Sequence, residues 1–150
     1  VTGVQTCALP ILIPMTNYRF QFYDRGIFNI GTAGGQTKGS SGYTFRFIQK
    51  RSDLIASLLC SETNWSSVEK KLQALEKTPS RFHFYDNVLL NVLWHHYFPG
   101  DQVFTRLFQR NKAEKVFRFL DNETTLLEEI RIISSLPTGP FLKAALRTLG

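Results

Sequence analysis

A loop rich in glycines and hydroxyl groups is the part of the sequence best suited to chemistry. Residues 31–42 hold five glycines and four serine or threonine hydroxyls within twelve positions. Glycine lets the backbone approach a ligand closely, since it carries no side chain. The hydroxyls and the amide of Gln36 supply hydrogen bonds. This composition indicates either a loop that binds a ligand or a flexible surface linker, because linkers share it.

The segments on both sides of this loop favour ligand binding. A β-prone segment at residues 27–30 precedes the loop, and apolar residues with roughly helical spacing follow it at 43–59. The first turn of a helix leaves N–H groups unpaired and carries a partial positive charge. It therefore suits a phosphate or the electron-rich pyrimidine edge of a reduced flavin. The glycine spacing matches neither the P-loop pattern nor the G-x-G-x-x-G pattern.

The histidines and cysteines form no metal-binding pattern. His95 and His96 are adjacent in the sequence and point about 100° apart on a helix, which makes a poor metal pair. Cys7 and Cys60 match neither a zinc spacing nor a disulfide framework, which favours a reducing, cytosolic compartment. We expect no bound metal, and we expect Cys60 to be a small buried apolar residue.

Three acidic residues are candidates for acid–base chemistry. Asp121 and Glu123 precede a helical segment, and we predict that they cap it. Asp86 lies inside an apolar helical segment, and we predict that it makes a structural hydrogen bond. No catalytic acid is therefore assigned in this sequence.

The elements that position these residues are a strand pair followed by helices. Tyr18, Phe20 and Phe22 alternate with polar residues, which predicts a strand that pairs as a hairpin with residues 27–30 across a turn at 24–26. The remainder has helical periodicity. The predicted fold class is α+β, mainly α-helical with an N-terminal β-hairpin. After the helix at 43–59, the predicted helices cover residues 65–77, 82–97, 101–109, 112–120, 123–135 and 141–149, with Asn64 or Ser66 capping the first of these and Asp101 the third.

The composition is that of one modest globular domain. The chain has 150 residues, of which 43% are hydrophobic, and a net charge of +6. Nucleic acid, an anionic lipid surface and a solvated surface all fit such a charge. The basic residues are spread along the chain without an Arg-rich arm, so no nucleic-acid partner is expected. No apolar run reaches the roughly 18–20 residues that span a bilayer.

The first eleven residues have a separate origin in our interpretation. Residues 1–11 read VTGVQTCALPI, which resembles the translation of a sequencing adapter fused to a metagenomic reading frame. Such artefactual segments are excluded from fold reasoning. We therefore expect the natural part of the chain to begin at residue 12 and to be truncated there.

Several segments carry a resemblance to a known family. Residues 13–16 (IPMT) and 30–49 (IGTAGGQTKGSSGYTFRFIQ) resemble the flavin-contacting C-terminal stretch of bacterial lycopene cyclases. Further similarity lies in residues 84–90 (FYDNVLL), 103–108 (VFTRLF), 119–124 (FLDNET) and 140–144 (PFLKA).

The resemblance implies a C-terminal portion of a two-domain α/β FAD/NAD(P)-binding flavoprotein of the Rossmann type. Residues 12–60 are then a flavin-contacting strand–loop–helix unit, and residues 61–150 are a helical region. In related flavin hydroxylases the matching strand ends in Gly-Asp, whereas this sequence has Gly31-Thr32. The implied flavin-binding residues are Gly31, Thr32, Ala33, Gly34, Gly35, Gln36, Thr37, Ser40, Ser41, Gly42 and Tyr43.

The implied activity is a lycopene β-cyclase, which closes the ends of lycopene into β-ionone rings without net redox change. Reduced FAD is the implied cofactor, NADPH its external reductant, and lycopene the partner, met at the cytoplasmic face of a membrane. The family's dinucleotide fingerprint and acidic motif lie upstream, so we expect this piece to be inactive alone. Two alternatives stay open: a non-catalytic carotenoid- or lipid-binding helical module, and another flavin-dependent oxidoreductase of the same fold.

Overall fold

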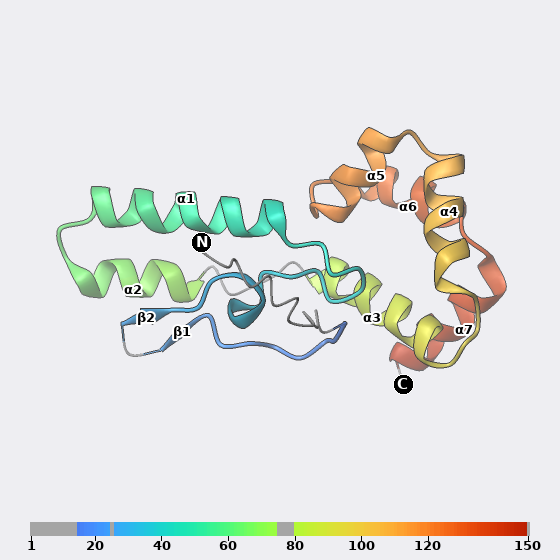
Figure 1. Cartoon of the computed structure of the whole chain (residues 1–150), viewed down its shortest axis with the longest axis horizontal. Coiled ribbons are helices and arrows are strands. Elements are labelled where there is room, and N and C mark those ends of the chain that lie inside the picture. The colour runs from blue at the N-terminus through green and yellow to red at the C-terminus, as the bar shows by residue number, and fades with distance from the viewer. Residues whose placement is uncertain (1–14, 25, 75–79, 150) are drawn as a thin grey trace, which may run out of the picture.

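The computed structural model describes residues 15–24, 26–74 and 80–149. Figure 1 shows the hairpin of residues 23–28 and the helices within residues 45–74 at one end of the molecule and the helices within residues 80–149 at the other, with the glycine-rich loop running between them. The predicted fold class, mainly helical with a hairpin near the N-terminus, is confirmed; the two-domain Rossmann-type context stays a prediction. The elements are β1 (Tyr23–Asp24), β2 (Ile27–Phe28), the 3₁₀ helix η1 (Gly31–Gly34), α1 (Phe45–Ser61), α2 (Trp65–Ala74), α3 (Ser80–Trp94), α4 (Gly100–Arg110), α5 (Ala113–Leu120), α6 (Leu126–Ser134) and α7 (Thr138–Leu149).

The hairpin is shorter than predicted and begins later. The antiparallel pairs are Tyr23 with Phe28 and Asp24 with Ile27, while residues 18–22 form no strand. Phe22 and Tyr23 are neighbours and both are buried, which breaks the alternation that a longer strand needs. The backbone N–H of Asn29 still donates to the Phe22 carbonyl oxygen at 2.8 Å, so the two segments of the hairpin stay paired beyond the two strands.

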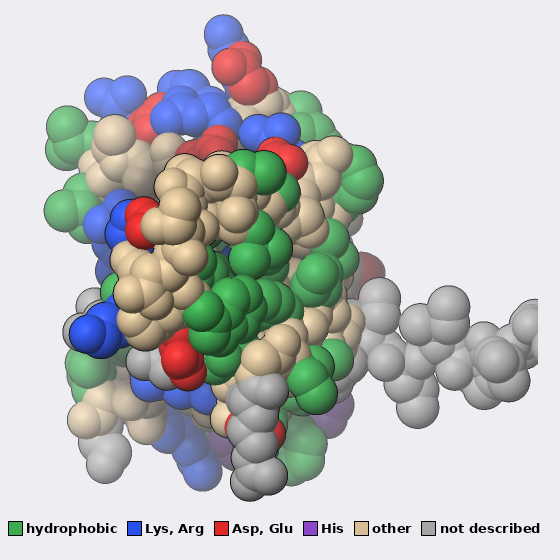
Figure 2. Space-filling model, turned by 90° about the vertical axis from the view of Figure 1, so that its left-hand side faces the viewer, with side chains coloured by type: hydrophobic (Ala, Val, Ile, Leu, Met, Phe, Trp, Pro, Cys, Tyr) green, Lys and Arg blue, Asp and Glu red, His purple; other side chains and the backbone are tan. Residues whose placement is uncertain are grey.

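A small core joins the hairpin to the first two helices. Phe22 and Tyr23 pack against Ile55 of α1 and against Val68 and Leu72 of α2. On the outside of this core, Ile27 and Trp65 stay exposed. Figure 2 looks onto this end and shows hydrophobic side chains gathered on its surface.

The larger core lies among the last five helices. Val88 and Val92 of α3 pack on Ala144 of α7, whereas Trp94 at the end of the same helix is exposed. A neighbouring cluster joins α4, α5 and α6 through Val103, Leu107, Val116, Leu120 and Ile132. No helix in the described ranges is long and apolar enough to cross a membrane.

Several predicted details at the helix ends are wrong for local reasons. Asp121 is the C-cap residue of α5, and Glu123 forms an ion pair with Lys50, so neither caps a helix start. The N-cap residue of α4 is Pro99, and Asp101 lies two residues later in the first turn of the helix. The last helix begins at Thr138, because a proline fits the first turn of a helix, where no N–H partner is needed.

Two further predictions concern the first part of the chain. The Asn64 cap is confirmed, since its Oδ1 atom accepts the backbone N–H of Ser66 at 3.0 Å. Cys60 is exposed, so its predicted burial is wrong. Residues 75–77 of the predicted helix 65–77, and the segment 1–11, lie outside the described residues.

The start of α6 is held by a capping box with a pH-dependent contribution to stability. The Glu128 carboxylate accepts the backbone N–H of Thr125 at 3.0 Å. This bond, followed by the Thr125 hydroxyl and Arg118, lowers the pKa of Glu128 below its usual 4.5. A lowered pKa in the folded state stabilises the protein above pH 4.5, and that contribution is lost as the pH falls through the folded-state pKa.

Glu128→Gln is therefore expected to lower the unfolding free energy at pH 7, and the difference from the parent protein is expected to shrink below pH 4.5. Urea unfolding at pH 7 and pH 3.5 measures it. Glu114→Gln is the matched control, since that exposed glutamate lies in the first turn of α5. A constant difference across this pH range would contradict the assignment.

Candidate functional site

The first half of the glycine-rich loop is folded by its own hydrogen bonds. The 3₁₀ helix is followed by its C-cap residue Gly35, whose φ of 69° is in the left-handed region. The side-chain amide of Gln36 accepts the N–H of Gly31 at 2.9 Å and donates to the Asn29 carbonyl oxygen at 3.4 Å. Gln36 is buried, so its side chain shapes the loop from the inside.

Close backbone contacts explain two of the loop's glycines. A Cβ atom at Gly34 would lie 1.9 Å from the Asn29 carbonyl oxygen, and one at Gly39 would lie 2.3 Å from the Thr16 carbonyl oxygen. Both distances are far too short for a side chain. These two glycines are thus required by packing of the chain against itself, whether or not a ligand is present.

The second half of the loop closes onto the start of α1. The Thr44 hydroxyl donates to the Gly42 carbonyl oxygen at 2.8 Å and lies 3.1 Å from the Thr37 hydroxyl oxygen. The Thr37 hydroxyl lies 3.2 Å from that of Thr32. The backbone N–H of Lys38 donates to the Tyr43 carbonyl oxygen at 2.8 Å. These bonds make the segment a compact loop, unlike a flexible linker.

An ion pair between the buried Lys38 and the partly buried Asp86 joins the loop to α3. The Lys38 ammonium lies 3.0 Å from Oδ1 of Asp86, and it donates to Oδ1 of Asn122 at 2.9 Å. The Ser40 hydroxyl donates to the same Asp86 oxygen. The rings of Phe82 and Phe119 lie within 6 Å of the ammonium, at 5.7 and 5.8 Å. The predicted structural hydrogen bond of Asp86 is confirmed, and it satisfies a buried charge.

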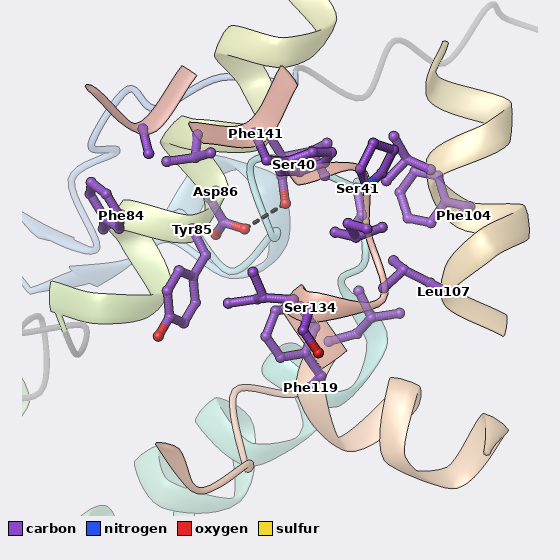
Figure 3. Close-up of a pocket in the computed structure, with 18 of the residues that line it drawn as sticks. Ser40, Ser41, Phe84, Tyr85, Asp86, Phe104, Leu107, Phe119, Ser134 and Phe141 are labelled. Atoms are coloured by element: carbon purple, nitrogen blue, oxygen red, sulfur yellow. Dashed lines mark hydrogen bonds between the residues drawn. The ribbon is translucent and has the colours of Figure 1, made fainter. Parts of the chain in front are cut away.

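An apolar pocket begins at this ion pair. Its volume is about 460 Å³, within the usual range for small-molecule sites. Lys38, Ser40, Ser41 and Asp86 lie at one part of its lining, while side chains of α3 to α7 supply mostly apolar walls. Figure 3 shows Ser40 and Asp86 joined by their hydrogen bond, with Phe104, Leu107, Phe119 and Phe141 around the pocket. Of the described residues that line it, Asp86 is the only carboxylate.

A second buried carboxylate lies beside the pocket without lining it. Glu129 is fully buried and accepts hydrogen bonds from Arg81 at 3.1 Å and from the Tyr85 hydroxyl at 3.0 Å. Burial raises the pKa of Tyr85, and the hydrogen bond to Glu129 raises it further. This cluster fixes α6 against α3, so the two walls of the pocket keep their spacing.

The predicted flavin-binding residues do not all lie on one surface, since Gly34 and Gln36 are buried within the loop. Ser40 and Ser41 line the apolar pocket. Ala33 and Gly35 are exposed elsewhere, and Tyr43 packs against the α4–α6 core cluster. Lys38 was not predicted as a site residue, and Asp86 was considered as an acid but assigned a structural hydrogen bond. The available signals were a lysine within the glycine-rich loop and an aspartate within a largely apolar helical segment, because such charges need partners when buried.

The start of α1 offers backbone N–H groups and one cation to an anionic ligand. Thr44 makes no side-chain cap hydrogen bond at the start of α1, and the next two residues, Phe45 and Arg46, are exposed. The start of a 17-residue helix without a side-chain cap suits an anionic ring edge or a phosphate, and Arg46, which also lies 3.7 Å from the Asp121 carboxylate, stands beside it. Which residues bind the cofactor stays a prediction.

Comparison with known families identifies the chain. A family model described as lycopene cyclase protein matches residues 5–146, which is nearly the whole sequence. The match includes part of the segment 1–11, whose origin as adapter sequence stays a prediction. No curated protein and no solved structure matches the chain. On the extent of the family match, the chain belongs to the lycopene cyclase family.

Proposed function

We propose that this chain is the C-terminal part of a lycopene β-cyclase and forms the pocket that holds one end of the polyene. The observation that carries the proposal is the pocket of about 460 Å³, which has apolar walls and a single lining carboxylate among the described residues. A hydrocarbon end group needs such walls, and the charge is suited to a cationic intermediate.

The reaction defines what the pocket must do. An acid protonates the terminal double bond of lycopene, a neighbouring alkene attacks the resulting cation, and loss of a proton gives the β-ring. The proton gained equals the proton lost, so no net oxidation occurs. Aromatic and aliphatic walls exclude water, which would otherwise trap the cation. The acid is proposed to come from the upstream motif that this sequence lacks.

Asp86 is proposed to present the negative end of its fixed ion pair with Lys38 at the wall of the pocket. Ser40 and Lys38 hold its Oδ1 atom, so the carboxylate is oriented before the polyene arrives. A preorganised charge stabilises a developing cation without reorganisation during the reaction. Reduced FAD, if bound, would supply a further negative charge to stabilise the cation, and the start of α1 with Arg46 is proposed to hold its anionic part.

The glycines with positive φ provide a test of the cofactor proposal. Gly35 and Gly42 have φ values of 69° and 72°, where a β-branched side chain is strained. Gly35→Val and Gly42→Val are expected to distort the loop and to reduce bound flavin several-fold in the purified full-length enzyme. Flavin absorbance per protein measures it. Gly35→Asn is the control, because asparagine tolerates this conformation. Unchanged flavin content in both valine variants would remove the loop from the cofactor site.

The activity itself is tested with the full-length enzyme and lycopene. We expect conversion to β-carotene with reduced FAD and without stoichiometric consumption of NADPH. Consumption of one NADPH per ring would instead support a flavin-dependent oxidoreductase. Tight carotenoid binding without any conversion would support a non-catalytic binding module.

A further inference from the structure

A second pocket lies along α3, apart from the apolar pocket. Its volume is about 410 Å³, and among the residues that the structure describes the two pockets share no lining residue. One wall is a face of α3 that runs from Asn87 to Trp94 with helical spacing. Thr148 of α7 and residues 15–17 complete the lining. The second pocket is therefore a separate candidate site.

Amide and hydroxyl groups dominate this second pocket, which we call the amide pocket. Five of its eight described lining residues carry such groups: Thr16, Asn17, Asn87, Asn91 and Thr148. None of the eight is charged. Amides and hydroxyls offer hydrogen-bond donors and acceptors but no counter-charge for an ion. The lining therefore suits a neutral ligand with several hydroxyl groups better than it suits a phosphate, a carboxylate or a hydrocarbon.

Two hydrogen bonds fix part of this lining before any ligand binds. The Nδ2 atom of Asn91 donates to the Thr148 hydroxyl oxygen at 2.9 Å, and the Thr148 hydroxyl donates to the Ala144 carbonyl oxygen at 2.9 Å. An asparagine amide has two N–H donors and one acceptor oxygen, so this single bond leaves capacity for a ligand. The Asn91 side chain is thus preorganised, which reduces the entropy lost on binding.

The Asn87 amide has hydrogen-bonding capacity that the protein does not use. Its Oδ1 atom is buried and accepts no hydrogen bond within the described part of the chain. Buried polar atoms nearly always have a partner, so this oxygen is an exception that needs a reason. The terminal torsion of asparagine is broad, and rotation of the amide would present the oxygen to a hydroxyl group in the pocket that the same side chain lines.

An exposed indole ring belongs to the same lining. Trp94 is 80% exposed, although it is one of the largest apolar side chains of the protein. The indole offers a flat apolar face, which packs on the C–H face of a sugar ring. The hydroxyl groups at the edge of such a ring would then meet the amides of Asn87 and Asn91. A flat aromatic ring next to uncharged amides is complementary to a saccharide.

We propose that the amide pocket binds a neutral saccharide, which stacks on Trp94 and accepts and donates hydrogen bonds at Asn87 and Asn91. The pocket shares no lining residue with the apolar pocket among the described residues, so this proposal does not rest on the proposed cyclase function.

Nuclear magnetic resonance of the chain locates the binding. The sequence has two tryptophans, so a ¹⁵N-labelled sample gives two indole N–H signals. The variant Trp65→Phe assigns them, because it retains only the Trp94 signal. On titration with D-glucose, D-galactose or D-mannose we expect a saturable shift of the Trp94 signal for at least one sugar and no shift of the Trp65 signal. We expect the 6-phosphate of that sugar to bind at least about fivefold more weakly, because no described lining residue supplies a cation.

Asn87→Leu separates binding from folding. Calorimetric titration with the sugar that binds is expected to show at least about tenfold weaker binding by this variant. Its unfolding free energy is expected to be unchanged or higher, because the substitution removes a buried acceptor that has no partner. A role in the fold alone would give the opposite pattern, with lower stability and unchanged binding.

Trp94→Ala tests the stacking. We expect it to weaken binding by at least about fivefold and to leave folding intact, since the ring is exposed. Trp65→Phe is the matched control, because this second exposed tryptophan lies on α2, outside the pocket lining. It is expected to bind the sugar as the parent chain does, and circular dichroism checks that each variant is folded.

Four results would overturn the proposal. They are no shift of the Trp94 signal with any of the three sugars, parental affinity in folded Asn87→Leu, tighter binding of the sugar phosphate than of the sugar, and a concentration-dependent dimer that Trp94→Ala dissolves. The last result would show that a second copy of the chain covers the amide pocket.

Discussion

Asp86→Leu is expected to lower the unfolding free energy by about 3–5 kcal/mol, the largest single effect that the structure predicts. The substitution leaves the Lys38 ammonium buried beside Phe82 and Phe119 with only Asn122 as a polar partner among the contacts described here. Breaking a buried ion pair is much more harmful than replacing both partners, because one charge stays behind without its counter-charge. Urea unfolding measures the loss.

The double variant Lys38→Met/Asp86→Leu separates the charge effect from loss of shape. We expect it to regain most of the stability lost in Asp86→Leu, because no charge then stays buried. Asp53→Leu is the matched control, since Asp53 is exposed on α1. If the double variant were as unstable as Asp86→Leu, the buried charge would not be the cause of the instability.

The same double variant also tests the chemical role of the carboxylate. In the full-length enzyme it is expected to fold, to retain carotenoid binding and to convert lycopene at least tenfold more slowly, because the pocket would lack the Lys38–Asp86 ion pair and the carboxylate that this pair orients. Wild-type turnover in this folded variant would show that Asp86 acts in folding only.

Ala145→Phe is expected to reduce conversion of lycopene by roughly 100-fold, because a phenyl ring would occupy space that the polyene end needs. Ala145 of α7 lines the pocket and packs beside the α3–α7 core cluster. The stability of the variant is expected to be unchanged or slightly higher, since the ring fills an apolar cavity. Product analysis by chromatography measures the conversion.

The control for this substitution is Ala56→Phe, at an exposed position of α1 away from the pocket lining. We expect this variant to convert lycopene at the parent rate. Normal conversion by Ala145→Phe, with correct folding, would place the polyene outside this pocket and contradict the proposed function.

Helical periodicity predicted most of the fold, because apolar spacing is a local property. The seven helices were expected near their observed positions, and errors lay at their ends. Glu123 was expected to cap α6, yet it pairs with Lys50 of α1, which is 73 residues away in the sequence. The N-cap residue of α6 is instead Thr125, because Glu128 three residues later completes a capping box with it. This Thr-x-x-Glu pattern was visible in the sequence.

The candidate site could be predicted only in part. The glycine-rich loop is held by its own hydrogen bonds rather than being a flexible linker, while its role in flavin binding stays a prediction. The predicted site residues of this loop did not include Lys38. Lys38 reaches Asp86 and Asn122, which lie 48 and 84 positions further along the chain, and no local pattern reports such a contact. The apolar pocket is equally non-local, because α3 to α7 all contribute to its walls.

Lys38 links two parts of the molecule through one residue. Its N–H and carbonyl groups close the loop through Tyr43, Ser41 and Gly42, while its side chain is anchored in the helical region at Asp86. The loop therefore cannot be exchanged independently of the helical region. A chimera that takes residues 31–43 from one relative and the helices from another should remain soluble only when the residues at positions 38 and 86 come from the same parent.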